Sequence, residues 1–265
     1  MTLITLSITD LLIAAALVVL VALLSWRLYL GSGKQLLIAA ARSAVQLMLI
    51  GFVLKLLFES SSLPFIALLS LFMLSVAGYE VMARQKQRFR GLWGYGIGAV
   101  SMFISSFSIM LLTLLVIIQP DPWYKPQYAI PLLGMLLGNT MTGVAVGLDN
   151  LTRNTREQRN QIEARLILGQ QWSEAIADVR KEALRSGLIP IINAMAAAGI
   201  VSLPGMMTGQ ILAGSPPYEA AKYQLLIMYL ITAGTGFGSL AAVWLGSRRL
   251  FDDRHRLRLE RLTNK

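Results

Sequence analysis

Apolar residues fall into seven long runs along the chain, separated by shorter polar stretches. The runs cover approximately residues 8–28, 36–58, 63–83, 92–118, 129–148, 187–203 and 223–245. A run of about 20 apolar residues, rising 1.5 Å per residue, crosses the ~30 Å hydrocarbon core of a membrane. The pattern therefore predicts an all-α, polytopic transmembrane helical bundle of about seven spans. The first run has no basic stretch before it, so we expect it to be a span and not a cleavable signal peptide.

The longest polar stretch, residues 149–190, lies between the fifth and sixth runs. It is too polar for lipid, and its apolar residues recur at helical spacing in two sets on either side of Gly169. The first set is Ile162, Leu166 and Ile167, and the second is Trp172, Ile176, Val179 and Ala183. Glycine commonly ends helices. The stretch therefore predicts two short amphipathic helices with a break at Gly169, a surface suited to a partner protein.

Glycine and proline mark two of the apolar regions. The fifth run contains two pairs of glycines four residues apart, Gly134 with Gly138 and Gly143 with Gly147. Such small-residue pairs let helices approach closely in lipid, so this helix is expected at the centre of the bundle. After the sixth run, the prolines and glycines of residues 203–217 favour a loop, a short helical turn and another loop.

Charge gives the expected orientation. The chain is 55% hydrophobic and 14% charged, against ~25% charged in soluble domains, with a net charge of +10. With the N-terminus outside and the C-terminus cytoplasmic, 21 of the 24 basic residues face the cytoplasm, leaving Lys55, Lys125 and Lys222 towards the outside. Basic residues concentrate on the cytoplasmic side of membrane proteins. Positive-inside topology thus explains the charge better than nucleic-acid binding does.

Several kinds of chemistry are excluded by residue content. There is no cysteine, the single histidine is His255 near the C-terminus, and the sequence contains no Walker A motif. No nucleophile–base pair or metal-ligand cluster occurs in the apolar runs. We therefore expect no catalytic residues, no cofactor bound by this chain and no enzyme activity of its own. If transport is driven by ATP, the ATP and magnesium bind to another polypeptide.

Polar side chains inside the runs are candidates for a transport pathway. Apart from Asp10 at the start of the first run, Glu80 is the one carboxylate within a run. A charge there is costly unless it has a role; the alternative is an ion pair with Arg84, four residues on. Asn139 and Asn193 offer amide oxygens to a hard cation, or else hydrogen bonds between helices. Gln46 shares a helix face with Arg42, which either contacts an anion or anchors to lipid headgroups.

Methionine gives a further pair of candidates. Met206 and Met207 could offer thioether ligands, although methionine more often fills gaps between helices. The residues define no metal-ligand set, so the metal site stays unknown.

The polar stretch also contains a motif. Residues 163–169 read EARLILG, which resembles the E-A-A-x-x-x-G coupling loop of ABC-transporter permeases, with Arg165 in place of the second alanine. The resemblance implies that Glu163, Ala164, Leu166, Gly169 and Trp172 contact an ATPase subunit. The proline that usually follows the glycine by thirteen residues is replaced by Glu182.

Three stretches together resemble one family. VSLPGMMTGQILAGSPPYEAAKYQ (201–224), IPLLGMLLGNTMTGVAVGLDNL (130–151) and ARSAVQLMLIGFVLKLLF (41–58) are similar to segments of the FetB-type iron-export ABC permease family, which includes plant membrane subunits implicated in aluminium tolerance. The resemblance implies a single permease domain over residues 1–265, with a cytoplasmic coupling loop (150–187) and a cytoplasmic basic tail (247–265).

The same resemblance implies a function. It implies export of iron or another metal ion across the bacterial cytoplasmic (inner) membrane by two copies of this chain with two copies of a cytoplasmic ABC ATPase. Three alternatives remain open from the residues alone. They are a self-sufficient carrier driven by protons through Glu80, an ABC permease for a nucleotide-sugar or other non-metal cargo, and a membrane scaffold without cargo.

Overall fold

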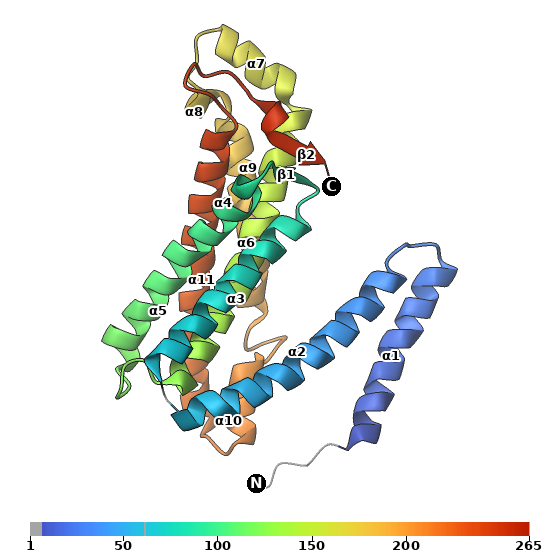
Figure 1. The fold of residues 1–265 in the computed structure, drawn as a ribbon, viewed down its shortest axis with the longest axis vertical. Coiled ribbons are helices and arrows are strands. Elements are labelled where there is room, and N and C mark those ends of the chain that lie inside the picture. The colour runs from blue at the N-terminus through green and yellow to red at the C-terminus, as the bar shows by residue number, and fades with distance from the viewer. Residues whose placement is uncertain (1–6, 61, 265) are drawn as a thin grey trace. The chain divides into compact units, whose positions relative to one another are not determined.

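A computed structural model describes residues 7–60 and 62–264. It is almost entirely helical, and it divides into two compact units, residues 1–62 with 212–214 and residues 63–211 with 215–265 (Figure 1). Each unit is described by itself. The single permease domain over residues 1–265 stays a prediction.

The smaller unit is a hairpin of helices α1 (Ile8–Arg27) and α2 (Gly33–Ser60). A capping box starts α1: the Asp10 backbone N–H donates to the Ser7 hydroxyl, and the Ser7 N–H donates to the Asp10 carboxylate at 2.8 Å. The helices meet closely at Gly33, where an added Cβ would lie 2.7 Å from the Ala22 carbonyl oxygen. Most apolar side chains of both helices are exposed, as suits helices that face lipid.

The remaining elements follow in chain order. They are α3 (Leu63–Arg84), β1 (Gln87–Phe89), α4 (Leu92–Met102), the π-helical η1 (Phe103–Phe107), α5 (Ser108–Leu112), the π-helical η2 (Thr113–Ile118), α6 (Pro126–Glu157), α7 (Arg159–Ile167), α8 (Trp172–Ala175), α9 (Ala177–Ala197), α10 (Gly205–Leu212), α11 (Pro217–Arg249), the 3₁₀ turn η3 (Leu259–Arg261) and β2 (Leu262–Asn264).

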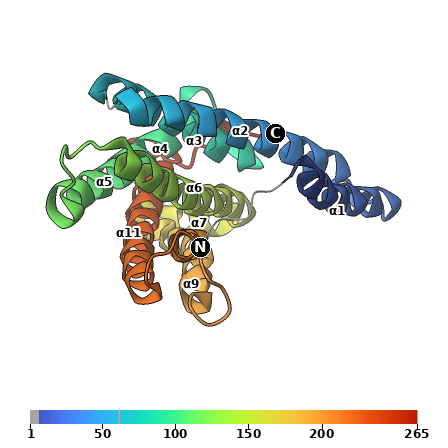
Figure 2. The same ribbon diagram turned by 90° about the horizontal axis from the view of Figure 1, so that it is seen from below.

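Helix α6 is the centre of the larger unit. It contacts α3, α4, α9 and α11, and Figure 2 shows α3 and α4 on one side of it and α9 and α11 on the other. Its leucines form much of the core, with Leu133, Leu136 and Leu151 fully buried. The central position predicted from the glycine-rich fifth run is confirmed in the larger unit.

The two glycine pairs of α6 differ. A Cβ at Gly143 would lie 2.5 Å from Thr235 of α11 and 2.9 Å from the Gly187 carbonyl of α9, and a Cβ at Gly147 would lie 3.3 Å from Val243. A Cβ at Gly134 would only touch Met73, at 3.4 Å, and at Gly138 it would meet nothing within 4 Å. Close helix approach is thus confirmed for one pair and wrong for the other, because the spacing of small residues does not specify which helix face has a neighbour.

Six helical segments in the described part of the chain are long and apolar enough to cross a membrane. Four of them match predicted runs to within three residues at each end. Helix α11 begins six residues before its run and ends four residues after it, and α6 extends nine residues beyond the predicted end of its run. The predicted sixth run, 187–203, is not among them. Its helix, α9, begins ten residues earlier and ends at Ala197, so its first half carries charges such as Arg180 and Glu182.

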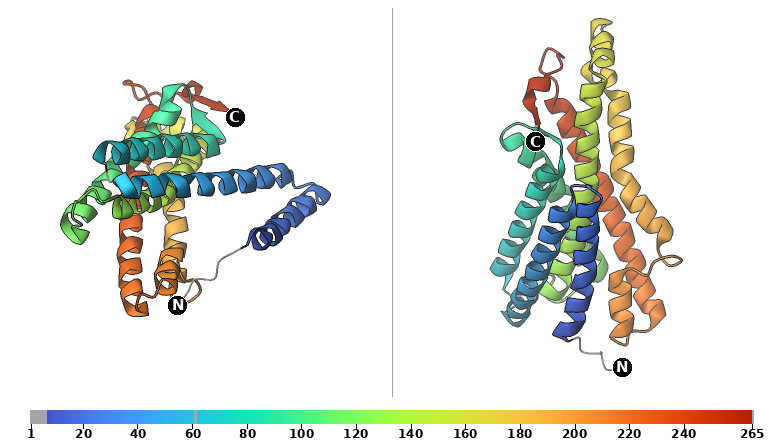
Figure 3. Two further views of the ribbon diagram at one scale, coloured as in Figure 1. Left: turned by 60° about the horizontal axis from the view of Figure 1, so that its bottom comes forward. Right: turned by 90° about the vertical axis from the view of Figure 1, so that its right-hand side faces the viewer.

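Helix α9 nevertheless lies against both α6 and α11 in the larger unit. Helix α11 spans about 50 Å for its 33 residues and ends beside α8, where Phe251 packs on Trp172. The chain must therefore run from α8 to the distant start of α11 through α9 and α10. Figure 3 shows α9 alongside α6. The seven-span topology stays a prediction, while the short helix predicted in residues 203–217 is confirmed as α10.

Candidate functional site

The turn between α7 and α8 reverses the chain at Gly169. Its backbone has φ = +91°, a left-handed conformation that favours glycine. The Gly169 N–H donates to the Leu166 carbonyl at 3.0 Å, and the Gln170 N–H donates to the Arg165 carbonyl at 3.1 Å. This pair of bonds is the Schellman arrangement, which satisfies the carbonyls at a helix end. The helix end predicted at Gly169 is confirmed.

An apolar tip stands out at this turn. Ile167 and Leu168 are 85% and 83% exposed, whereas Ile162, five residues earlier on α7, is buried. The expectation that Ile162 and Ile167 share one helix face is wrong, because five residues turn a helix by about 140° beyond a full circle. Leu166, four residues after Ile162, is half-buried as expected.

The tip is held by charged contacts behind it. The Arg165 guanidinium bonds the Asp178 carboxylate at 2.7 Å and the Ala175 carbonyl at 3.4 Å, which ties α7 to α8 and α9. Glu163 pairs along α7 with Arg159 at 2.8 Å, and Ala164 is exposed. The second predicted apolar set packs inwards: Ile176, Val179 and Ala183 are buried and Trp172 is half-buried.

Trp172 packs against the basic tail. Its ring lies 5.8 Å from that of Phe251, between centroids. Helix α11 continues through Arg249, and the folded segment that follows it begins at Leu250. The bounds 247–265 of a cytoplasmic tail stay a prediction. The tail also pairs β2 with β1 in an antiparallel ladder that matches Gln87 to Asn264 and Phe89 to Leu262. It therefore joins the α3–α4 connection to α8 and α11.

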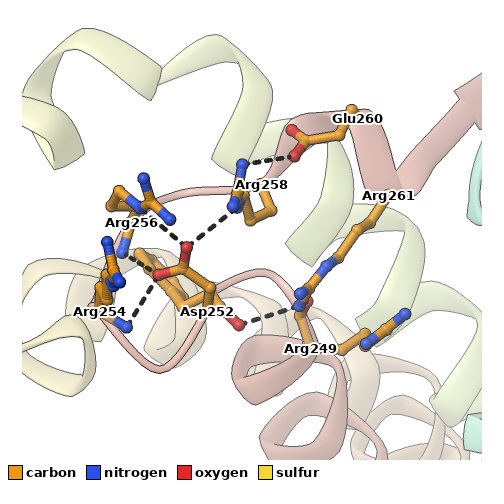
Figure 4. A network of polar contacts seen from close by, with 8 residues as sticks. Arg249, Asp252, Arg254, Arg256, Arg258, Glu260 and Arg261 are labelled. Carbon is orange, nitrogen blue, oxygen red and sulfur yellow. Dashed lines mark hydrogen bonds and ion pairs between the residues drawn. The ribbon is translucent and has the colours of Figure 1, made fainter.

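The Asp252 carboxylate holds the residues of the tail together through hydrogen bonds (Figure 4). Its carboxylate accepts the backbone N–H groups of Arg254 and Arg256 at 3.0 and 2.9 Å, and the Nε atoms of Arg256 and Arg258 at 2.9 and 3.1 Å. These donors favour the charged carboxylate, and the backbone bond from Arg256 contributes most to lowering the pKa of Asp252 to about 2.

Sequence reasoning missed the folded tail. Its arginines read as a solvated cytoplasmic end, and the three residues of β1 are too few for a strand pattern. One usable signal was Asp252 between flanking arginines, since an aspartate can bond the backbone two to four residues on.

The predicted pathway residues are scattered over several elements. Glu80 on α3 lies 4.0 Å from Arg84, consistent with the ion-pair alternative. Asn139 donates to the Met135 carbonyl of its own helix at 2.9 Å, and Asn193 on α9 is exposed. Gln46 is exposed on α2 of the smaller unit.

The two methionine candidates, Met206 and Met207, are half-buried on α10. Across residues 7–60 and 62–264, no three histidine, cysteine, aspartate or glutamate side chains gather as a metal site would require.

Comparison with known proteins identifies the family. The model of the uncharacterised protein family UPF0014 matches residues 8–251. This chain belongs to the UPF0014 family. The UPF0014 membrane protein slr1647 of Synechocystis is 36% identical, over 89% of this chain and 90% of that protein. The family relationship and the helices together make this a multi-pass membrane protein.

Two further UPF0014 relatives have descriptive names. Protein ALUMINUM SENSITIVE 3 of Arabidopsis thaliana is 35% identical over 88% of this chain and 84% of its own length. The probable iron export permease protein FetB of Escherichia coli is 31% identical over 97% of this chain and 96% of its own length. These relatives confirm the family resemblance seen in the sequence. No solved structure matches this chain.

Proposed function

We propose that this chain is the membrane-spanning subunit of an ATP-driven exporter in the bacterial inner membrane. In this proposal a separate ABC ATPase binds the coupling loop, two copies of each subunit form the transporter, and the cargo is iron or another metal ion. The chain itself binds no nucleotide or cofactor and catalyses no reaction. The name of the E. coli relative supports the permease class and the cargo.

The observation that carries the proposal is the apolar tip. Ile167 and Leu168 are more than four-fifths exposed at the end of a short helix, beyond the predicted spans. Lipid cannot cover them if the loop is cytoplasmic, whereas a hydrophobic groove on a partner can. We expect the same partner to contact Glu163, Ala164, Leu166, Gly169 and Trp172, which lie in or next to the motif.

Transmission of movement follows from the contacts of the tip. A push on the tip reaches Arg165, passes through its ion pair to Asp178, and so reaches α9. Helix α9 packs on α6 and α11 through Gly187, so a shift of α9 would change the core of the larger unit. Two packings of similar energy suffice, since ATP supplies the bias.

Contacts with the cargo would come from amide and thioether groups more than from carboxylates. Glu80, Asn139, Asn193, Met206 and Met207 remain the candidates, with Gln46 on α2. A metal ion held weakly by such ligands could be released readily.

The decisive experiment is co-purification from the native membrane of the wild-type chain and of two variants. Leu168→Glu should abolish association with a P-loop ATPase, because it places a charge where an apolar groove must close. Gln170→Glu adds the same charge two residues on without removing an apolar contact and should keep the partner. Retention of the ATPase by Leu168→Glu, or ATP-independent transport by the isolated chain in liposomes, would contradict the proposal.

A further inference from the structure

A cleft between α3, α6 and α9 carries unexplained polar groups. It has a volume of about 490 Å³. Its polar lining comes from Arg84 at the end of α3, from Asp149, Asn150 and Arg153 on α6, and from Ser186 on α9. None of these residues belongs to the coupling tip, and none was predicted as a pathway residue.

The two guanidinium groups of the cleft are not neutralised by its carboxylate. Asp149 accepts the Lys86 backbone N–H at 2.8 Å, and within residues 7–60 and 62–264 neither Arg84 nor Arg153 forms a salt bridge with it. Among the described residues, the salt bridge that Arg84 forms is the long 4.0 Å contact with Glu80. The positive charge in the cleft therefore exceeds the negative charge, which favours an anion over a cation.

Neutral donors complement the two arginines. The Asn150 amide donates to the Ser186 hydroxyl at 3.2 Å, and the Asn150 oxygen accepts from Asn154 at 2.9 Å. Because the Ser186 oxygen accepts this bond, its own O–H remains available as a donor. Arginine binds phosphate through two parallel N–H bonds, and hydroxyl donors bind the remaining oxygens.

The cleft also has an apolar end. Val146, Ile189 and Pro190 line it, and Val146 and Ile189 are 38% and 46% exposed. From Thr142 to Arg153, α6 rises about 16 Å, so the lining changes from apolar to charged along the helix. In the predicted topology the charged end lies at the cytoplasmic headgroup level, because Arg84 is the last residue of its span.

We propose that this cleft binds a phosphate-bearing ligand, with Arg84 and Arg153 on the phosphate and Ser186 as an additional donor. The phosphate belongs either to a phospholipid headgroup of the inner leaflet or to a soluble phosphate. The apolar end next to the charged end matches a phospholipid, whose first acyl carbons would lie along Val146 and Ile189. Asn150, Arg153 and Ser186 fall within the predicted coupling loop (150–187), but none of the lining residues belongs to the apolar tip at Ile167 and Leu168, so the site does not depend on the proposed ATPase contact.

Binding of short-chain lipids to the delipidated full chain in detergent tests the site. The probes are dihexanoyl phosphatidylglycerol, inorganic phosphate and dihexanoylglycerol, which lacks the phosphate, with binding measured by native mass spectrometry and calorimetry. Arg84→Gln and Arg153→Gln should each weaken binding of the phosphorylated probe about tenfold, the effect of losing one charge-assisted pair. Arg254→Gln is the matched control, because the backbone of Arg254 and not its guanidinium bonds Asp252.

The outcomes separate the two sources of phosphate. Tight binding of the phospholipid with weak binding of inorganic phosphate, both sensitive to the two cleft arginines, identifies a lipid. Equal, arginine-dependent binding of inorganic phosphate identifies a soluble ligand. Binding that is unchanged in both cleft variants, or equal binding of dihexanoylglycerol, overturns the proposal. Circular dichroism and gel filtration of each variant establish that the helices remain folded.

Discussion

The turn between α7 and α8 and the basic tail lie at the same end of the larger unit, yet their side chains are exposed and paired in opposite ways. The turn leaves the side chains of Ile167 and Leu168 exposed, and its backbone is held by a few local hydrogen bonds. The tail directs its arginines to Asp252 and to backbone carbonyls, and it buries Phe251. A segment with unsatisfied apolar surface is suited to a partner, whereas one whose groups are satisfied internally is suited to supporting the fold.

The largest effect expected from this contrast is a loss of stability on Phe251→Ala. Phe251 is 5% exposed and packs on Trp172, so its removal should cost ~3 kcal/mol, the lower end of the range for buried phenylalanines. Thermal unfolding in detergent measures the loss. Phe237→Ala, at a 61% exposed position on α11, is the control and should change the midpoint little. Equal effects of the two variants would mean that the tail does not support the fold.

The next effect concerns pH and the Asp252 carboxylate. Its pKa is lowered from 3.8 to about 2 by bonds made in the folded tail. Its contribution to stability is therefore present above about pH 4 and is lost as the pH falls through about 2.

Pepsin cleavage between Leu250 and Phe251 reports on this loss, because the tail must open to be cut. The wild-type chain should become several-fold more sensitive between pH 4 and pH 2, relative to an Asp252→Asn variant that is already sensitive at pH 4. Parallel curves for the two proteins would show that the carboxylate does not hold the tail closed.

The smallest expected effect tests the turn itself. Gly169→Ala forces a side chain into the left-handed conformation at φ = +91° and should cost about 1 kcal/mol. The same change at Gly138, in the middle of α6 with nothing within 4 Å of an added Cβ, should be neutral or slightly stabilising. Thermal unfolding shows whether each substitution lowers or raises the stability of the protein. A stabilising Gly169→Ala would contradict the left-handed turn.

Apolar runs and glycine positions predicted much of the fold. Long apolar runs imply membrane helices on length alone, and Gly169 ends a helix because the backbone there requires a left-handed residue. Predictions that depend on which face meets a neighbour were less reliable. Gly134 and Gly143 have the same local pattern, and only the three-dimensional arrangement of α9 and α11 distinguishes them.

The site was predicted in part, for similar reasons. The spacing from Glu163 to Gly169 marked the turn, but the exposure of Ile167 depends on the orientation of α7 against its neighbours. The cleft arginines Arg84 and Arg153 lie far apart in sequence and meet through helix packing. The pairing of residue 87 with residue 264 was hidden for the same reason, because short strands gain their stability from a distant partner.

The β1–β2 ladder has a consequence for how the protein is made. Phe89 pairs with Leu262, so the earlier strand leaves the ribosome 173 residues before its partner exists. At the usual ~5–20 residues per second, this interval is about 9 to 35 seconds. During that time the α3–α4 connection has an open edge, and it closes only when residues 262–264 have left the ribosome. A chain whose synthesis stops before residue 262 therefore cannot form this ladder.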